Sequence, residues 1–125
     1  MHHLTSWEAA EIICRDQGFH LVRIDDAAEN ATVRALVTQL AGNYEFYIGA
    51  SDLAVEGSWR WSDGELFWLG GPAGAPAPGL YANWIAGVEP NNFDVGTEDV
   101  AVMTNAGDWN DVNPSGVRPY VCERN

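Results

Sequence analysis

The stretch from Ser62 to Glu98 constrains the fold of this chain most, because little of it has the pattern of a helix or a strand. Its middle part, from Gly70 to Gly79, is rich in Gly, Pro and Ala and can form neither a helix nor a central strand. Loops of this length are uncommon in compact domains and are usually functional, because something must offset the entropy lost on ordering them. A bound metal ion is one way to do so.

Carboxylates and side-chain amides gather at the end of this stretch and beyond it. They are found in Glu89-Pro90-Asn91-Asn92, in Glu98-Asp99 and in Trp109-Asn110-Asp111. Oxygen donors of these types are the ligands that a hard divalent cation prefers, and Ca²⁺ takes about six to eight of them. Calcium is therefore the first cofactor that we expect.

The length and charge of the chain exclude several classes of function. At 125 residues, we expect a single domain over 1–125 with one core. A net charge of -12 with only six Lys and Arg argues against nucleic acid or anionic lipid as a partner, because both require basic patches. No segment approaches the roughly 20 apolar residues of a membrane span, so we expect no membrane insertion.

The two cysteines, Cys14 and Cys122, stand near opposite ends of the chain. They are compatible with one disulfide in a secreted or extracellular protein, and two buried free thiols are the alternative. The N-terminus lacks the charged and then apolar pattern of a signal peptide. Since Met1-His2-His3 is typical of an engineered start, we expect that a native leader has been removed.

Two helices are predicted in the first third of the chain. Thr5-Ser6-Trp7-Glu8 has the pattern of a capping box, and the helix that follows should run to about Asp16 and stop at Gly18. Asp25 and Asp26, with Glu29, should open a second helix that ends at Gly42-Asn43. Its apolar stripe is expected to consist of Val33, Leu36, Val37 and Leu40.

Short aromatic and β-branched segments predict strands. They are expected at His20–Ile24, Phe46–Ala50, Ser58–Trp61, Val100–Thr104 and Pro119–Glu123. We expect Trp59, Trp61, Trp84 and Trp109 to be buried, whereas Phe67, Trp68 and Tyr81 flank the irregular loop and are candidates for exposed contacts with a ligand. The three His residues show no metal-ligand spacing.

An ordered series of motifs runs from end to end of the chain and resembles that of C-type lectin carbohydrate-recognition domains. The motifs are Trp7-Glu8-Ala9-Ala10, Cys14, Tyr47-Ile48-Gly49-Ala50-Ser51-Asp52, Glu56-Gly57-Ser58-Trp59-Arg60-Trp61-Ser62-Asp63-Gly64, Asn83-Trp84, Glu89-Pro90-Asn91, Glu98-Asp99, Trp109-Asn110-Asp111 and Tyr120-Val121-Cys122-Glu123. The resemblance implies an α+β fold with two helices, a mixed or antiparallel sheet and a long calcium-binding loop region. It also implies a disulfide between Cys14 and Cys122. The family's inner disulfide would join the positions of Val100 and Pro114, which are not cysteines here.

By the same resemblance, two sets of residues would bind Ca²⁺. The principal site, which also binds the sugar, would consist of Glu89, Asn91, Glu98, Asn110 and Asp111. An auxiliary site would consist of Asp52, Glu56, Asn92 and Asp99. Glu89 with Asn91, and Glu98 with Asn110, would each pair a carboxylate acceptor with an amide donor around one sugar hydroxyl. Pro90 is expected to follow a cis peptide bond.

By the resemblance to C-type lectins, the order Glu89-Pro90-Asn91 implies a preference for the equatorial hydroxyls of mannose, glucose and N-acetylglucosamine, and for fucose. The function implied is calcium-dependent binding of glycans, with homo-oligomers or tandem domains supplying avidity. The alternative is a protein-binding or ice-binding module of the same fold. We expect no enzymatic activity, because no nucleophile has a base near it and metal-bound carboxylates stay ionised.

Overall fold

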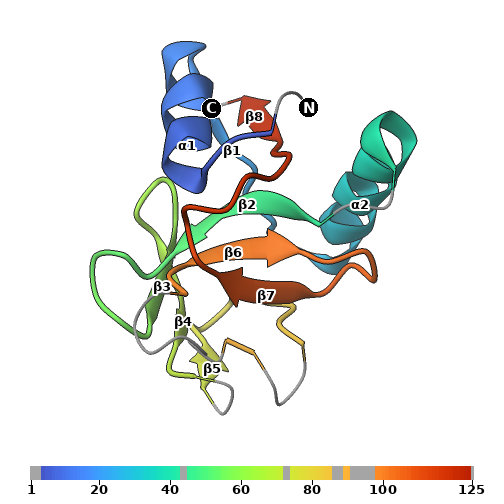
Figure 1. Ribbon diagram of the computed structural model, residues 1–125. Helices are drawn as coiled ribbons and strands as arrows, with labels where there is room; N and C mark the ends of the chain where they lie inside the picture. Colours follow the sequence, from blue (N-terminus) through green and yellow to red (C-terminus); the bar gives the residue numbers. More distant parts are fainter. Residues whose placement is uncertain (1–3, 43–44, 72–73, 86–88, 91–97, 125) are drawn as a thin grey trace.

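Two helices flank a curled antiparallel sheet in the computed structural model, which describes residues 4–42, 45–71, 74–85, 89–90 and 98–124 (Figure 1). The helices are α1 (Trp7–Asp16) and α2 (Ala27–Ala41), and the strands are β1 (Phe19–Leu21), β2 (Phe46–Ser51), β3 (Ser58–Trp61), β4 (Leu66–Leu69), β5 (Ala75–Pro76), β6 (Val100–Met103), β7 (Trp109–Val112) and β8 (Cys122–Arg124). The large sheet has the order β5-β4-β3-β2-β6-β7, and β1 pairs with β8 in a separate ribbon. This confirms the predicted α+β class.

Helix α1 begins one residue later than the predicted capping box. Ser6, and not Thr5, is the N-cap, and its Oγ accepts a hydrogen bond from the backbone N–H of Ala9 at 3.4 Å. Glu8 therefore lies in the first turn, where its negative charge interacts favourably with the helix dipole, and it is not at the position of the capping-box acid. The helix ends at Asp16 as predicted.

Helix α2 has the predicted ends but only part of the predicted apolar stripe. The Asp26 carboxylate accepts a hydrogen bond from the N–H of Glu29 at 2.7 Å, and Gly42 ends the helix with a φ of 92°. Val33 and Val37 are buried, whereas Leu36 is 42% exposed. The prediction for Leu36 was wrong, because the sheet contacts a narrower face of the helix than the apolar residues cover. The side chain of Leu40 lies outside the described part.

The strands at Ser58–Trp61 and near Phe46 and Val100 agree with the prediction, but others differ. The predicted strand His20–Ile24 is shorter and lies at Phe19–Leu21, while Pro119–Glu123 is replaced by Cys122–Arg124. Strands β4, β5 and β7 were not predicted. Strand β5 contains Pro76, which is compatible with its place at the edge of the sheet.

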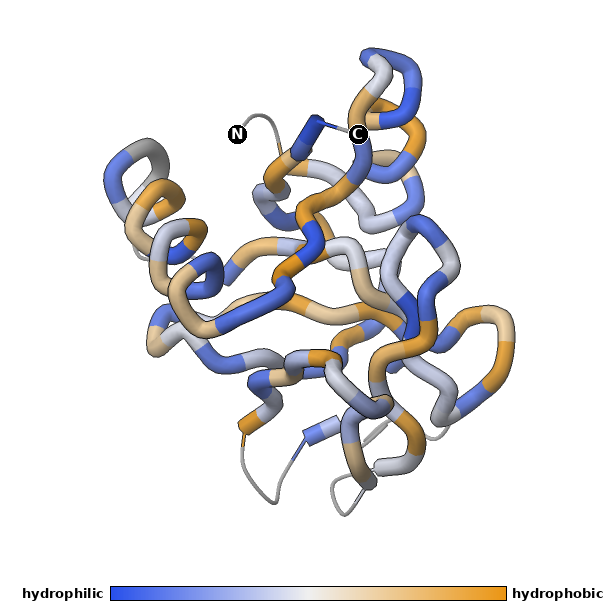
Figure 2. Tube along the Cα trace, turned by 180° about the vertical axis from the view of Figure 1, so that it is seen from behind, coloured by the Kyte–Doolittle hydropathy of each residue, from blue (hydrophilic) through white to orange (hydrophobic). Residues whose placement is uncertain are grey.

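Both faces of the central strands are buried. Alternate residues of β2 point into different clusters: Phe46, Ile48 and Ala50 pack with α2 and the tryptophans, and Tyr47 packs with α1. Strand β6 alternates in the same way. Figure 2 shows the resulting hydrophobic middle, with hydrophilic and hydrophobic residues alternating along the helices.

A disulfide joins Cys14 of α1 to Cys122 of β8, with an S–S distance of 2.03 Å. This confirms the pairing implied by the resemblance and excludes the free thiols. Within the described ranges, no helix has the length and apolar character needed to cross a membrane.

Candidate functional site

An acidic cluster lies where β2 ends and β6 begins. Asp52 follows β2, Asp99 precedes β6, and the pairing of Ser51 with Val100 brings the two segments together. The backbone N–H of Asp52 donates to the carbonyl of Asp99 at 3.0 Å. Carboxylate oxygens of Asp52, Glu56 and Asp99 lie within 4.8 Å of one another, so one cation can contact all of them. The structure thus brings together these predicted auxiliary ligands, while Asn92 lies outside the described residues.

Hydrogen bonds from the described residues satisfy only some of the carboxylate oxygens of this cluster. Asp52 is only 3% exposed, and its Oδ2 accepts a hydrogen bond from the N–H of Gly57 at 2.8 Å. Among the described residues, no hydrogen-bond partner reaches the buried Oδ1 atoms of Asp52 and Asp99. Buried carboxylate oxygens without a partner are unfavourable, and a cation or a proton relieves the cost.

The electrostatics of the cluster agree with this geometry. Burial is the main cause that raises the pKa of Asp52 from 3.8 to about 8, and the Glu56 and Asp99 carboxylates also raise it. Burial raises the pKa of Asp99 as well, with contributions from Glu56 and from the charge of Asp111. Hard oxygen donors that repel one another suit Ca²⁺, so the residues present fit this ion.

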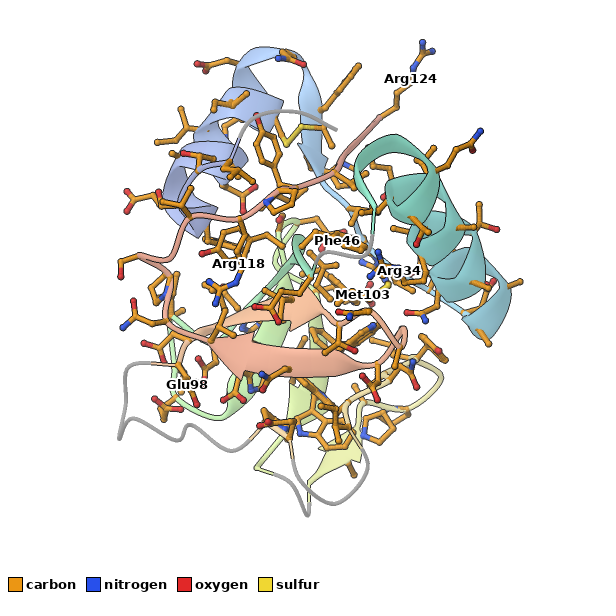
Figure 3. All side chains as sticks on the ribbon, turned by 45° about the vertical axis from the view of Figure 1, so that its right-hand side comes forward. Arg34, Phe46, Glu98, Met103, Arg118 and Arg124 are labelled. Carbon is orange, nitrogen blue, oxygen red and sulfur yellow. A yellow bond between two sulfur atoms is a disulfide. The ribbon has the colours of Figure 1, made fainter. Side chains whose placement is uncertain are left out.

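Strand β7 carries Asn110 and Asp111 at the edge of the sheet beside this cluster. Asp111 is fully buried and Asn110 is half-buried. Because Val112 pairs with Val100, residues 98 and 99 reach the end of β7, and Figure 3 shows Glu98 there. Asp111 is close enough to Asp99 to raise the pKa of that carboxyl.

Glu89 is connected to β7 through the backbone. Its N–H donates to the carbonyl of Ile85 at 3.0 Å, and the N–H of Ile85 donates to the carbonyl of Trp109 at 3.0 Å. Glu89 is 8% exposed, and the bond from Glu89 to Pro90 is cis, as predicted. Asn91, the remaining member of the predicted principal set, lies outside the described residues.

The tryptophans support the site from the core. Trp59, Trp61, Trp84 and Trp109 are buried as predicted, and the ring of Trp109 lies edge-on to Trp61 at 5.5 Å and to Trp84 at 5.9 Å. Phe67 is also fully buried, which removes it as a candidate for an exposed contact; its ring stacks on Trp61 at 4.5 Å. Trp68 and Tyr81 are half-buried.

Two asparagines that the sequence did not single out for a role contact this region. Asn30 of α2 is buried and bonds to Trp109, and Asn83 bonds to the turn before β7. A signal for Asn30 was present, because it precedes Val33 and Val37 by three and seven residues and therefore lies on the buried face of the helix. For Asn83, the only signal in the sequence was its position next to Trp84.

Comparison with protein families and curated proteins gives consistent matches. The Lectin C-type domain model matches residues 3–124. The chain is 33% identical over 120 residues to C-type lectin domain family 17, member A, of Homo sapiens, covering 95% of this chain and 27% of that protein. It is 33% identical over 121 residues to C-type lectin lectoxin-Lio1 of Erythrolamprus poecilogyrus, covering 94% of this chain and 66% of that protein. The chain thus spans less than two-thirds of the length of these relatives.

Solved structures share the fold over nearly all of the chain. The human scavenger receptor C-type lectin carbohydrate-recognition domain has a TM-score of 0.79 at 30% identity, covering 100% of this chain and 87% of that one. The cow CD23 domain, solved in the presence of a GlcNAc2Man3 oligosaccharide, has a TM-score of 0.71 at 30% identity, with coverages of 98% and 81%. Herring type II antifreeze protein, at 23% identity and a TM-score of 0.73 over 96% and 83%, shares the fold alone. By its matched family model, its relatives and its fold, this chain belongs to the C-type lectin domain family.

Proposed function

We propose that this chain is a calcium-dependent carbohydrate-binding domain, spanning 1–125, and not an enzyme. The observation that carries the calcium requirement is the pair of buried Oδ1 atoms of Asp52 and Asp99, which have no hydrogen-bond partner among the described residues. With Glu56 they would hold one ion. Glu89, Asn91, Glu98, Asn110 and Asp111 would hold the ion at the sugar site, and Asn92 would complete the auxiliary set.

Bound calcium would supply positive charge and open coordination positions for two neighbouring sugar hydroxyls. The residues around it would satisfy the same hydroxyls. The carboxylates of Glu89 and Glu98 would accept the hydroxyl protons, and the amides of Asn91 and Asn110 would donate to the hydroxyl oxygens. The order Glu89-Pro90-Asn91 supports mannose, fucose or N-acetylglucosamine as the sugar class.

The partners in this proposal are glycans of an extracellular environment, which the disulfide also favours. Two hydroxyls on an exposed ion bury little apolar area, so a single site should bind with a dissociation constant on the order of millimolar. Homo-oligomers or tandem domains would supply the avidity that such an affinity requires. Nucleic acid is not a partner of a chain with a net charge of -12.

Isothermal titration separates this function from that of a protein-binding or ice-binding module, which the antifreeze likeness in fold keeps as the alternative. Titration of the metal-free protein with calcium, and then with mannose, fucose and galactose, should show calcium binding followed by millimolar binding of mannose or fucose. EDTA, or acidification to about pH 4, should abolish both by removing or protonating the ligands. Calcium binding without sugar binding, on this panel and on a glycan array, would contradict the lectin function.

A double variant tests the sugar preference. Glu89→Gln with Asn91→Asp exchanges donor and acceptor and should shift binding from mannose toward galactose. The control, Glu8→Gln with Asn105→Asp, makes the same two changes at exposed positions outside the site and should leave the preference unchanged. If the first variant kept its mannose preference, other residues would determine the specificity.

A further inference from the structure

A buried amide on α2 holds the beginning of the strand that carries Asn110 and Asp111. Trp109 Nε1–H donates to Asn30 Oδ1 at 2.9 Å, and Asn30 Nδ2 donates to the carbonyl of Gly107 at 2.8 Å. Asn30 is 7% exposed and Trp109 is fully buried. Asn30 thus anchors both the Trp109 side chain and the backbone of the turn between β6 and β7, which Figure 1 shows reaching toward α2.

The same turn is joined to the segment that leads to Glu89. Asn83 Nδ2 donates to the carbonyl of Gly107 at 2.9 Å, so this carbonyl accepts from two asparagines. The N–H of Trp109 donates to the carbonyl of Asn83 at 2.8 Å, and Ile85 returns a bond to the Trp109 carbonyl at 3.0 Å. Trp109 therefore links α2, β7 and the 83–85 segment, from which Glu89 is one hydrogen bond away.

Arg34, one turn further along α2, makes a second contact with the β6–β7 turn. Its Nη1 donates to the carbonyl of Thr104 at 2.8 Å, and its guanidinium lies 5.1 Å from the centre of the Phe46 ring. Figure 3 shows Arg34 beside Phe46 and Met103. Arg34 fixes the turn as a whole, whereas Asn30 holds the side chain of the residue immediately before Asn110.

We propose that Asn30 is a positioning residue for the calcium and sugar site and acts through Trp109. This inference rests on the proposed function. Removal of the Asn30 amide would leave the indole N–H of Trp109 buried without its acceptor, which raises the free energy of the folded state. A shift of Trp109 or the entry of water would relieve this penalty. Asn110 and Asp111 follow Trp109 along β7, so a shift of Trp109 moves them. Loss of a group that orients the ligands typically lowers metal affinity by about 10-fold to 100-fold.

The test compares Asn30→Ala with Val37→Ala. Val37 is fully buried on the same helix and packs into the same core, but its apolar side chain makes no hydrogen bond that the substitution could remove. Both variants should lower the melting temperature. Asn30→Ala should also weaken calcium binding by about tenfold, the lower end of the effect of orienting groups. Val37→Ala should leave the calcium dissociation constant within about twofold of the wild type, because it does not alter Trp109 anchoring.

Two further measurements keep the inference testable. Asn30→Asp keeps an oxygen for the Trp109 N–H but loses the donor to Gly107, so its calcium affinity should be intermediate; it replaces Asn30→Ala if that variant does not fold. In the calcium-free protein, amide hydrogen exchange at residues 109–112 should be faster in Asn30→Ala than in Val37→Ala.

The outcomes separate this inference from the function on which it rests. A wild-type protein that binds no calcium contradicts the proposed function, and the exchange comparison alone then decides whether Asn30 positions β7. Faster exchange in Asn30→Ala supports the positioning role, and equal exchange overturns it. Where the wild type does bind calcium, equal weakening by Asn30→Ala and Val37→Ala shows that Asn30 contributes only stability and overturns the inference.

Discussion

Asp52 shows at the scale of one residue why a bound cation would stabilise this fold. Its carboxylate is nearly inaccessible to solvent and faces the acidic groups of Glu56 and Asp99. The N–H of Gly57 satisfies one oxygen, and this contact lowers the pKa of Asp52, but burial dominates and raises the pKa to about 8. The folded calcium-free protein therefore prefers Asp52 protonated, whereas the unfolded chain ionises it near 3.8.

This difference predicts how the stability of the calcium-free protein depends on pH. Because the folded pKa of Asp52 lies above the unfolded value, its contribution is fully present below about pH 4 and is lost as pH rises through about 8. Asp52→Asn removes the titration and keeps an oxygen for the Gly57 N–H. In EGTA, the free energy of unfolding of the variant minus that of the wild type should increase with pH across this window, by at most about 1.4 kcal/mol per unit.

Chemical denaturation in EGTA from pH 4 to 9 measures this difference. In the presence of calcium the wild type should be more stable than Asp52→Asn, because the variant loses a charged ligand and the wild type gains stability from the bound ion. A difference that stays constant with pH would mean that Asp52 is ionised in the folded calcium-free protein.

At the scale of elements, the β4–β5 hairpin orders part of the long irregular stretch without a helix or a long strand. Trp68 pairs with Pro76, and its indole N–H donates to the carbonyls of Gly70 and Gly71 at 3.1 and 3.2 Å. The hairpin also lies near the site, because a Cβ on Gly71 would be 3.5 Å from the carbonyl oxygen of Pro90. Backbone contacts and the hydrogen bonds of Trp68, together with the burial of Phe67, therefore shape this segment.

Gly74 is the residue on which this hairpin depends most. A Cβ at this position would lie 2.2 Å from the carbonyl oxygen of Leu69, which is backbone and cannot move alone. Gly74→Ala should lower the free energy of unfolding by about 1 to 3 kcal/mol, as overpacking typically does. Gly71→Ala is the matched control, since its Cβ meets only ordinary contacts, and it should be nearly neutral. Urea denaturation measures both, and equal effects would show that the hairpin adapts to a side chain at 74.

At the scale of the whole molecule, the disulfide joins elements from the two ends of the sequence on the side away from β7. Cys14 and Cys122 are separated by 108 residues, and the adjacent β1–β8 ribbon is also joined by His20 and Glu123, whose side chains meet at 2.9 Å. The acidic cluster lies at the opposite end of β2 and β6 from α2. Stability and calcium affinity should therefore respond differently to loss of the disulfide.

Replacing both cysteines by alanine should lower the free energy of unfolding by about 4 to 5 kcal/mol, the loop-closure entropy of a segment of this length. Calcium affinity of the folded fraction should change by less than about twofold, because no predicted ligand lies on α1 or β8. Urea denaturation and calcium titration measure the two quantities. An unchanged stability would show that the disulfide does not stabilise this fold by restraining the unfolded chain.

Local patterns predicted the elements whose energy is mostly local. Asp26 and Gly42 mark the ends of α2 correctly, because caps act within one turn of the helix. Strand β7 was missed, since Asn110 and Asp111 lack strand propensity and join the sheet through pairing with β6, which the local sequence pattern does not show. Leu36 was misplaced because its spacing fits the stripe but the sheet contacts a narrower face.

The sequence by itself determined the order of motifs, the oxygen donors, the pair of cysteines and, through these, the family. Only the tertiary structure decided which donors meet, because contact between residues as distant as Asp52 and Asp99 depends on the register of β2 and β6. It alone showed that Asn30 holds Trp109, since a buried amide finds its partner across the fold and not along the chain. Residue types determine which atoms can bind a ligand, whereas the packing of distant segments determines where those atoms lie relative to one another.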